Sequence, residues 1–381
     1  MEYTKIKEIN RYISKSINPA KMPNTVFEMY SVPAYETGHP EYLYGREIAS
    51  SKVVVKKNDI LLCKINPRIN RVWLVLDESD NQNIASSEWI VIRTDEYNPE
   101  FLVWYFRTPQ FKQKMMSEVT GIGGSLTRAQ PKRVAEYLIP VIDRKRQDRI
   151  AIVLNKIASI VDLRKKELKA YDELIKSRFV EMFGDIPDDK KVMMAEVCKI
   201  ITDGTHQPPK FTPIGIPFLF VSNIVTNEIN YDAEKFISEE TYDELIKRTP
   251  IEIGDILLST VGSYGHPAIV KSNKQFCFQR HIAYIKPDAA LVNSEYLRGA
   301  ILSENVQRQI DKRVKGIAQK TLNLSEIRKL RLPLPPMEQQ GRFAAFVAQT
   351  DKSKLTIQKS LEELETLNKA LMQKYFGGNG V

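Results

Sequence analysis

Two long stretches of the chain place apolar residues at every seventh position, without a proline or a glycine to interrupt them. Residues 147–183 are followed by Gly184, and residues 342–376 are followed by Gly377. Glycine commonly follows the last turn of a helix because it adopts left-handed backbone angles without strain. We therefore predict two long helices. The main apolar column of the first consists of Leu154, Val161, Leu168, Ile175 and Met182.

The two predicted helices are apolar in complementary columns. The second column of the first helix turns polar and consists of Ile150, Ile157, Arg164, Tyr171 and Arg178. The equivalent column of the second helix stays mostly apolar and consists of Phe343, Thr350, Ile357, Leu364 and Leu371, while its other column is mixed and consists of Val347, Lys354, Leu361, Asn368 and Tyr375. We predict that they pack on each other as an antiparallel coiled coil. A homodimeric coiled coil remains the alternative.

The chain also repeats itself, with a period near 193–196 residues. The matched positions are Asn58–Ile65 with Gly254–Val261, Pro140 with Pro333, Gln147 with Gln340, and Phe183 with Phe376. Ahead of the first helix lie short β-rich runs, such as residues 53–55, 72–76 and 90–92, which are separated by turn residues. The predicted fold class is α+β, with an internal pseudo-twofold repeat. It comprises mixed α/β globular domains at 1–140 and 185–335, each followed by a helical spacer, at 141–184 and 336–381.

Composition narrows the class of protein. The chain has 381 residues, a net charge of +9 and 27% charged residues, and a pI near 9.1. A basic balance suits a nucleic-acid partner, although many basic proteins bind none. No apolar run reaches the roughly 18 residues of a membrane span. We therefore expect a cytoplasmic protein with no membrane partner.

Motifs for catalysis are missing from the sequence. It contains no Asn/Asp-Pro-Pro-aromatic site of an amino-methyltransferase, no GxxxxGK[ST] loop and no HExxH helix. The three cysteines, Cys63, Cys198 and Cys277, are too far apart for a zinc motif. We predict a chain with no catalytic residue, no metal site and no cofactor of its own.

The loops that follow the repeated Asp-Ile-Leu-Leu segments carry candidate DNA-binding residues. In the first half these are Lys64, Asn66, Arg68, Asn70 and Arg71. Arginine suits guanine O6 and N7, and asparagine suits adenine N6 and N7. An ordinary polar hairpin loop is the alternative. In the second half the matching segment is small and contains Ser263 and Tyr264, which favours phosphate positioning.

Further candidates surround the glycines of both halves. Residues 121–130 supply Ser125 and Arg128, and residues 316–322 supply Gln319 and Lys320. Two clusters occur only in the second half, and their candidates are Thr205, His206, Gln207, Lys210, Gln279 and Arg280. His206 has neither a nucleophile nor metal ligands beside it in the sequence. We therefore expect it to stabilise a turn or contact a base rather than act as a general base.

The same segments carry a resemblance to a known family. Residues 203–210 (Asp-Gly-Thr-His-Gln-Pro-Pro-Lys), with Gly254–Leu258 and Gln279-Arg280, resemble a target recognition domain of type I restriction–modification specificity subunits. Residues 30–38 and 64–71 resemble another class of target recognition domain. Residues 332–340, leading into the second helix, are similar to the family's helical region. The resemblance covers essentially the whole chain, but the first half has no Asp-Gly-Thr-His.

The resemblance implies a non-catalytic subunit that recognises a bipartite double-stranded DNA target. It implies two methyltransferase subunits as partners, and motor–nuclease subunits in the full complex. The methyl donor would belong to the methyltransferase, and ATP and magnesium to the motor. The alternatives are a specificity partner of a type II restriction–methylation enzyme and a free-standing DNA-binding regulator.

Overall fold

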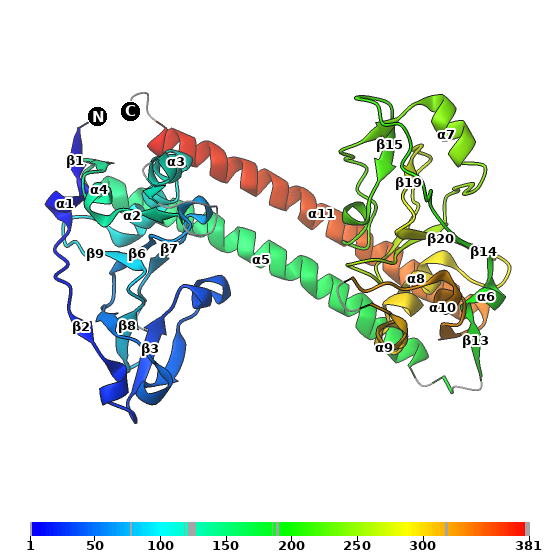
Figure 1. The fold of residues 1–381 in the computed structure, drawn as a ribbon, viewed down its shortest axis with the longest axis horizontal. Helices are drawn as coiled ribbons and strands as arrows, with labels where there is room; N and C mark the ends of the chain where they lie inside the picture. Colours follow the sequence, from blue (N-terminus) through cyan, green and yellow to red (C-terminus); the bar gives the residue numbers. More distant parts are fainter. Residues whose placement is uncertain are drawn as a thin grey trace. The chain divides into compact units, whose positions relative to one another are not determined.

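The fold comes from a computed structural model that describes residues 2–76, 78–117, 119–120, 127–184, 186–187, 190–316 and 319–377. The chain forms two compact units (Figure 1). The first unit consists of Met1–Leu163 and Leu361–Val381, and the second consists of Arg164–Ser360. Both of the long helices described below therefore contribute a part to each unit.

The first unit is built on two small sheets. A five-stranded sheet has the order β2-β5-β8-β3-β4, and a three-stranded sheet has the order β7-β6-β9. The strands are β1 (Tyr3–Lys5), β2 (Ser16–Ile17), β3 (Val26–Tyr30), β4 (Glu41–Tyr44), β5 (Lys52–Val54), β6 (Ile60–Cys63), β7 (Val72–Leu74), β8 (Gln82–Ala85), β9 (Trp89–Ile92), β10 (Val119–Thr120), β11 (Arg128–Ala129) and β12 (Leu138–Pro140). The short helices are α1 (Ile6–Ile9), α2 (Pro99–Phe106), α3 (Pro109–Ser117) and α4 (Pro131–Val134). The predicted β-rich runs at 53–55, 72–76 and 90–92 are thus confirmed as β5, β7 and β9.

The second unit also contains two small sheets, with a different number and order of strands. Its four-stranded sheet has the order β14-β20-β17-β18, and a three-stranded sheet has the order β16-β15-β19. The strands are β13 (Lys191–Met193), β14 (Cys198–Asp203), β15 (Ile216–Leu219), β16 (Phe236–Ile237), β17 (Ile256–Ser259), β18 (Pro267–Ile269), β19 (Cys277–Phe278), β20 (Ile282–Pro287) and β21 (Arg331–Pro333). The short helices are α6 (Met194–Val197), α7 (Glu239–Leu245), α8 (Ser294–Leu302), α9 (Glu304–Arg313) and α10 (Leu324–Arg328).

The two long helices are α5 (Arg144–Phe183) and α11 (Met337–Phe376), each of 40 residues. The second begins at Met337 rather than at 342, because one glycine, Gly341, costs a helix only about 1 kcal/mol and does not end it. In the second unit, Phe343 contacts Phe179 and Phe183, and Lys354 pairs with Asp172 at 2.6 Å. The helices therefore run antiparallel and pack on each other within one chain, as their columns predicted.

A buried glutamine at the start of each long helix ties it to its globular part. The Gln147 side-chain oxygen accepts a hydrogen bond from the Asn98 N–H at 2.8 Å, and Gln340 does the same for Asn293 at 2.8 Å. Each side-chain amide donates to a carbonyl of the preceding turn, at Ile142 (2.7 Å) or Pro335 (2.8 Å). The internal repeat is therefore present in the contacts as well as in the order of elements.

We expect Gln340→Ala to lower the free energy of unfolding by about 1–3 kcal/mol, because buried backbone groups lose their partners. Gln340 is fully buried and bonds three backbone groups, those of Asn293, Leu291 and Pro335. Denaturant unfolding would measure the change. The neighbouring Gln339→Ala is the control because that residue is exposed. Equal midpoints for the two variants would contradict the anchoring role.

Candidate nucleic-acid interface

The first candidate loop leaves the end of strand β6 and folds into a single turn of 3-10 helix over Pro67–Ile69. Asn66 (φ 51°) and Asn70 (φ 55°) flank this turn in the left-handed conformation, which asparagine tolerates better than most residues. The Asn70 side chain donates to the Phe106 carbonyl at 3.0 Å, so it holds the loop in place. Arg68 is exposed on the turn.

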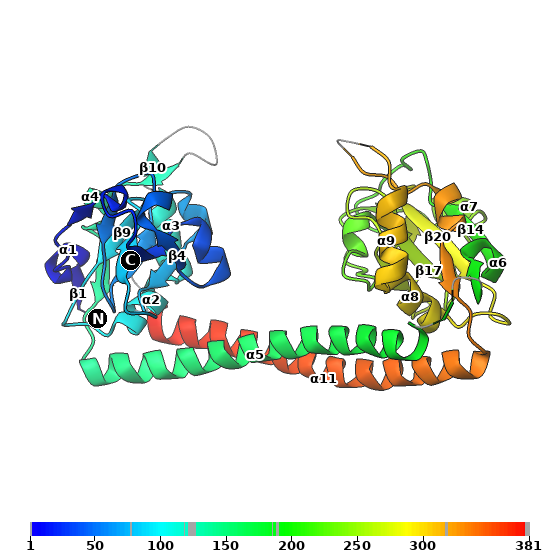
Figure 2. The same ribbon diagram turned by 90° about the horizontal axis from the view of Figure 1, so that it is seen from below.

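The second candidate segment of the first half lies against this loop. Ile65 forms a β-bridge with Arg128, the Asn66 N–H donates to the Thr127 carbonyl at 2.9 Å, and the Ala129 N–H donates to the Lys64 carbonyl at 2.8 Å. The β10–β11 hairpin lies at the end of the first unit that is far from α5 (Figure 2). Two segments about 60 residues apart in the chain thus form one surface. Ser125 lies outside the described residues.

Carboxylates accompany the candidate cations of this surface. The Glu88 carboxylate lies 3.3 Å from the Arg128 guanidinium and 3.9 Å from the Lys64 ammonium. Glu36 pairs with Arg71 at 2.9 Å, and the Arg71 side chain is only 15% exposed. These contacts fix the cations before any ligand arrives, which reduces the conformational entropy lost on binding.

In the second unit the four candidate segments also converge. Thr205 bridges Gln279, and the Arg280 N–H donates to the Thr205 carbonyl at 3.0 Å. The Gly262 N–H donates to the Lys320 carbonyl at 3.1 Å, and the Leu322 N–H donates to the Thr260 carbonyl at 2.8 Å. These bonds join the segments in two pairs.

A hollow of about 440 Å³ lies where the segments meet. Its lining includes Asp203, Thr260, Arg280, His281 and Gln319. The structure therefore brings Arg280 and Gln319, which the sequence predicted separately, to one place. His281, which directly follows Arg280, also lines this hollow and is not among the candidate residues identified from the sequence.

The Asp-Gly-Thr-His turn is held by a carboxylate. An Asp203 oxygen lies 2.9 Å from the His206 Nε2, and the other accepts from the Arg248 guanidinium at 2.6 Å. His206 therefore stabilises the turn, one of the two roles expected for it. Gln207 and Lys210 are exposed beyond it. Arg248 follows α7 and carries no local motif, so only the tertiary structure reveals it.

The glycine-rich loop after β17 adopts positive φ at Gly262 (73°) and Gly265 (81°), angles that suit glycine. Helix α9 holds this loop: the Tyr264 hydroxyl donates to Asp311 at 3.0 Å, and Gln307 donates to the Gly265 carbonyl at 2.9 Å. Ser263 is exposed at its tip, while the Lys320 ammonium lies 6.0 Å from the Tyr264 ring centre. Exposed backbone and small side chains here fit phosphate contacts.

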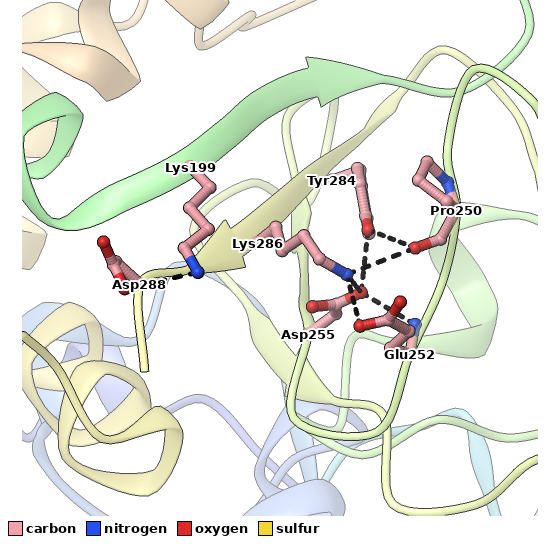
Figure 3. A network of polar contacts seen from close by, with 7 residues as sticks. All are labelled: Lys199, Pro250, Glu252, Asp255, Tyr284, Lys286 and Asp288. Carbon is pink, nitrogen blue, oxygen red and sulfur yellow. Dashed lines mark hydrogen bonds and ion pairs between the residues drawn. The ribbon is translucent and has the colours of Figure 1, made fainter. Parts of the chain in front are cut away.

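A polar network supports the strand that leads into this loop (Figure 3). An Asp255 oxygen accepts from the Glu252 N–H at 2.8 Å, lies 2.7 Å from the Tyr284 hydroxyl, and lies 3.3 Å from the Lys286 ammonium. Burial, together with the hydrogen bond to Asp255, raises the pKa of Tyr284, so the hydroxyl remains a donor. The network fixes the turn before β17.

The part of the chain that the structure describes contains neither a group of side chains suited to bind a metal ion nor a helix suited to span a membrane. Among those residues, no three His, Cys, Asp or Glu side chains gather in a way that could hold a metal ion. No described helix has the length and apolar character to cross a bilayer.

Comparison with known proteins gives a coherent set of matches. Residues 188–366 match the family model of the type I restriction modification DNA specificity domain. The type I restriction enzyme MjaVIII specificity subunit of Methanocaldococcus jannaschii is 21% identical over 411 residues, covering 99% of this chain and 92% of that protein. A relative from the same organism, provisionally assigned as the MjaX specificity subunit, is 26% identical over 201 residues. That match covers 51% of this chain and 47% of the relative, so the chain spans about half of that relative's length.

Among solved structures, a chain from work on the assembly and conformational transition of the type I restriction–modification system is similar to this one. It has a TM-score of 0.56 and 20% identity, and the match covers 100% of this chain and 98% of that chain. At this identity the likeness establishes the fold: two mixed α+β parts with two long helices.

Proposed function

Because the chain belongs to the specificity subunits of type I restriction–modification systems, we propose that each of its units recognises one half of a bipartite double-stranded DNA target. The observation that carries the proposal is the convergence of separate candidate loops on one surface in each unit. The two surfaces occupy equivalent places in the repeat but carry different side chains, which suits two different half-site sequences.

The proposed target recognition domains are residues 1–140 and 185–335, with the helical segments 141–184 and 336–381 as spacers. The starts of the long helices at Arg144 and Met337 support these boundaries. In the proposed arrangement the chain supplies recognition, and its partners supply the chemistry. It needs no cofactor of its own and works in the cytoplasm, where its DNA and its partners are.

The proposed partners are two methyltransferase subunits, joined by motor–nuclease subunits in the full complex. Helix α5 offers a surface for a partner in the first unit: Ile152 is 61% exposed, Ile160 is 37% exposed and Leu163 is 59% exposed. Spacings of eight and three residues place these side chains on one face of the helix. Exposed apolar groups on one face mark a protein-binding surface more often than scattered ones do.

Reconstitution of methylation tests the proposed function. The purified chain alone is expected to methylate no DNA, and addition of its methyltransferase subunit should give adenine methylation at one bipartite sequence. If the chain copurifies with a single protein in which methyltransferase and nuclease are fused, and with no separate nuclease subunit, the type II alternative would be favoured. Sequence-specific DNA binding without any methyltransferase association would favour the regulator.

Base discrimination should divide between the two units. Replacing a base-contacting arginine with alanine is expected to cost about 1–3 kcal/mol of discrimination. Arg68→Ala should therefore relax only the first half-site, and Arg280→Ala only the second, so each variant is the other's control. Competition binding with half-site variants measures both. Arg342→Ala on α11, whose side chain is 71% exposed, should change neither half-site. Equal relaxation of both half-sites by one variant would contradict the assignment.

A further inference from the structure

Glu88 and His281 occupy the same backbone position in the two units. Glu88 directly precedes β9, and its carbonyl accepts from the Lys64 N–H at 3.0 Å. His281 directly precedes β20, and its carbonyl accepts from the Thr260 N–H at 3.0 Å. In both units the backbone N–H of the first loop residue, Lys64 or Thr260, is therefore hydrogen-bonded to this position.

The other side of each loop is bonded in the same way. The Lys64 carbonyl accepts from the Ala129 N–H at 2.8 Å, and the Thr260 carbonyl accepts from the Leu322 N–H at 2.8 Å. We call the position of Glu88 and His281 the shared seat. These backbone hydrogen bonds are the same in both units, whereas the side chain at this seat is a carboxylate in one unit and an imidazole in the other.

The Glu88 carboxylate has unused hydrogen-bonding capacity. Its Oε2 atom is buried and has no hydrogen-bond partner among the described residues, and the Lys64 ammonium is 3.9 Å away from it. Its Oε1 atom lies 3.3 Å from Arg128, while the side chain as a whole stays 25% exposed. A buried carboxylate oxygen without a donor is costly, so a ligand that supplies an N–H group here would be favoured.

His281 gives the shared seat a different chemistry. It lines the 440 Å³ hollow together with Arg280 and Gln319. The Arg280 Nε–H donates to the His281 Nε2 at 3.3 Å. Burial and the adjacent Arg280 charge lower the pKa of His281, which favours the neutral ring. With Nε2 accepting, the proton of the neutral ring is on Nδ1, which can donate.

Building on the proposed function, we infer that the shared seat is a specificity-determining position in each half-site. Glu88 accepts a hydrogen bond from the amino group of a cytosine or an adenine in the first half-site. His281, next to Arg280, favours the acceptors of a guanine in the second. Carboxylates select exocyclic amino groups in the major groove, whereas hydrogen-bond donors select guanine O6 and N7.

Methylation mapping of three variants tests this inference. The chain is produced with its methyltransferase in a host without other adenine methylation, and the methylated sites are sequenced. Glu88→Gln should change the preference at one or two base pairs of the first half-site by about tenfold or more, with the second half-site unchanged. His281→Gln should do the reverse. The unaffected half-site is an internal control for each.

Glu96→Gln is the matched control. Glu96 follows the same strand β9 at its other end, pairs with Arg11 and is 54% exposed, so both half-sites should stay as in the wild type. Unchanged preferences in the Glu88 and His281 variants would overturn the inference. If a variant no longer methylates DNA, its purified complex with the methyltransferase is used to select DNA from a library of half-site sequences. Selection of the wild-type half-site sequence would also overturn the inference. Absence of a bipartite motif in the wild type would instead count against the proposed function.

Discussion

Phe343→Ala is expected to lower the free energy of unfolding of the second unit by about 3–5 kcal/mol, as removal of a buried aromatic ring usually does. Phe343 is fully buried, and its ring centre lies 5.4 Å from that of Phe179 and 5.9 Å from that of Phe183. Gly299 of α8 completes the contact, because a Cβ there would lie 2.8 Å from a Phe343 ring carbon. The site is tightly packed, so the neighbouring side chains can do little to fill the cavity that the Phe343→Ala substitution leaves.

Urea unfolding of the full chain measures this effect. Leu355→Ala on the same helix is the control, since Leu355 is 53% exposed and loses little buried surface. Phe343→Leu should recover much of the loss because leucine refills part of the volume. A Phe343→Ala midpoint equal to that of Leu355→Ala would show that α11 is not anchored through this ring.

The long helices and the central strands were predictable because both depend on local periodicity. Ile175 and Leu154 lie in the predicted main column of α5, and both are buried. The Asp-Ile-Leu-Leu segments became β6 and β17, which are buried throughout and lie inside their sheets. The repeat made these predictions stronger, because two independent segments carried the same pattern.

Strand pairing between distant segments was beyond sequence reasoning. Strand β1 pairs with β12, with Tyr3 opposite Pro140, and β13 pairs with β21 in the same way in the second unit. Three-residue strands carry too little pattern to identify a partner more than 130 residues away. The pairing closes each globular part directly before its long helix, and it depends on the tertiary fold.

The sequence indicated which loops form the candidate surfaces but not what each side chain does there. Asn70 is a predicted DNA-binding residue, and the sequence did not indicate that its amide also bonds the Phe106 carbonyl. Arg248 and Glu88 were not predicted, because their partners, Asp203 and Arg128, are about 40 residues away in the chain. An ion pair of that separation leaves no local signal, so those assignments had to come from the structure.

Asp255→Ala is expected to lower the free energy of unfolding by about 3–5 kcal/mol, because it removes a charged acceptor shared by the Lys286 ammonium, the Tyr284 hydroxyl and the Glu252 N–H. The Asp255 side chain is 5% exposed and that of Lys286 is 18% exposed. Tyr284 is fully buried and loses one of the two acceptors near its hydroxyl, while the Glu252 N–H loses its hydrogen bond to the Asp255 carboxylate. The turn before β17 should therefore loosen together with the loop that follows this strand.

A double-mutant cycle separates this network from simple loss of packing. Asp255→Ala removes one of the two carboxylates beside Lys286, and Lys286→Ala removes the cation beside Asp255. The double variant removes both members of the pair, so its cost should be smaller than the sum of the two. Glu252→Gln is the control, because its side chain is 70% exposed and its pair with Lys286 is screened by water. If the unfolding free-energy changes of the two single variants add up to that of the double variant, Asp255 stabilises the unit through the Glu252 backbone and Tyr284, and not through Lys286. If the coupling is present, the loosened turn should also weaken binding of the second half-site and leave the first unchanged, since β17 ends at the loop that carries Ser263 and Tyr264.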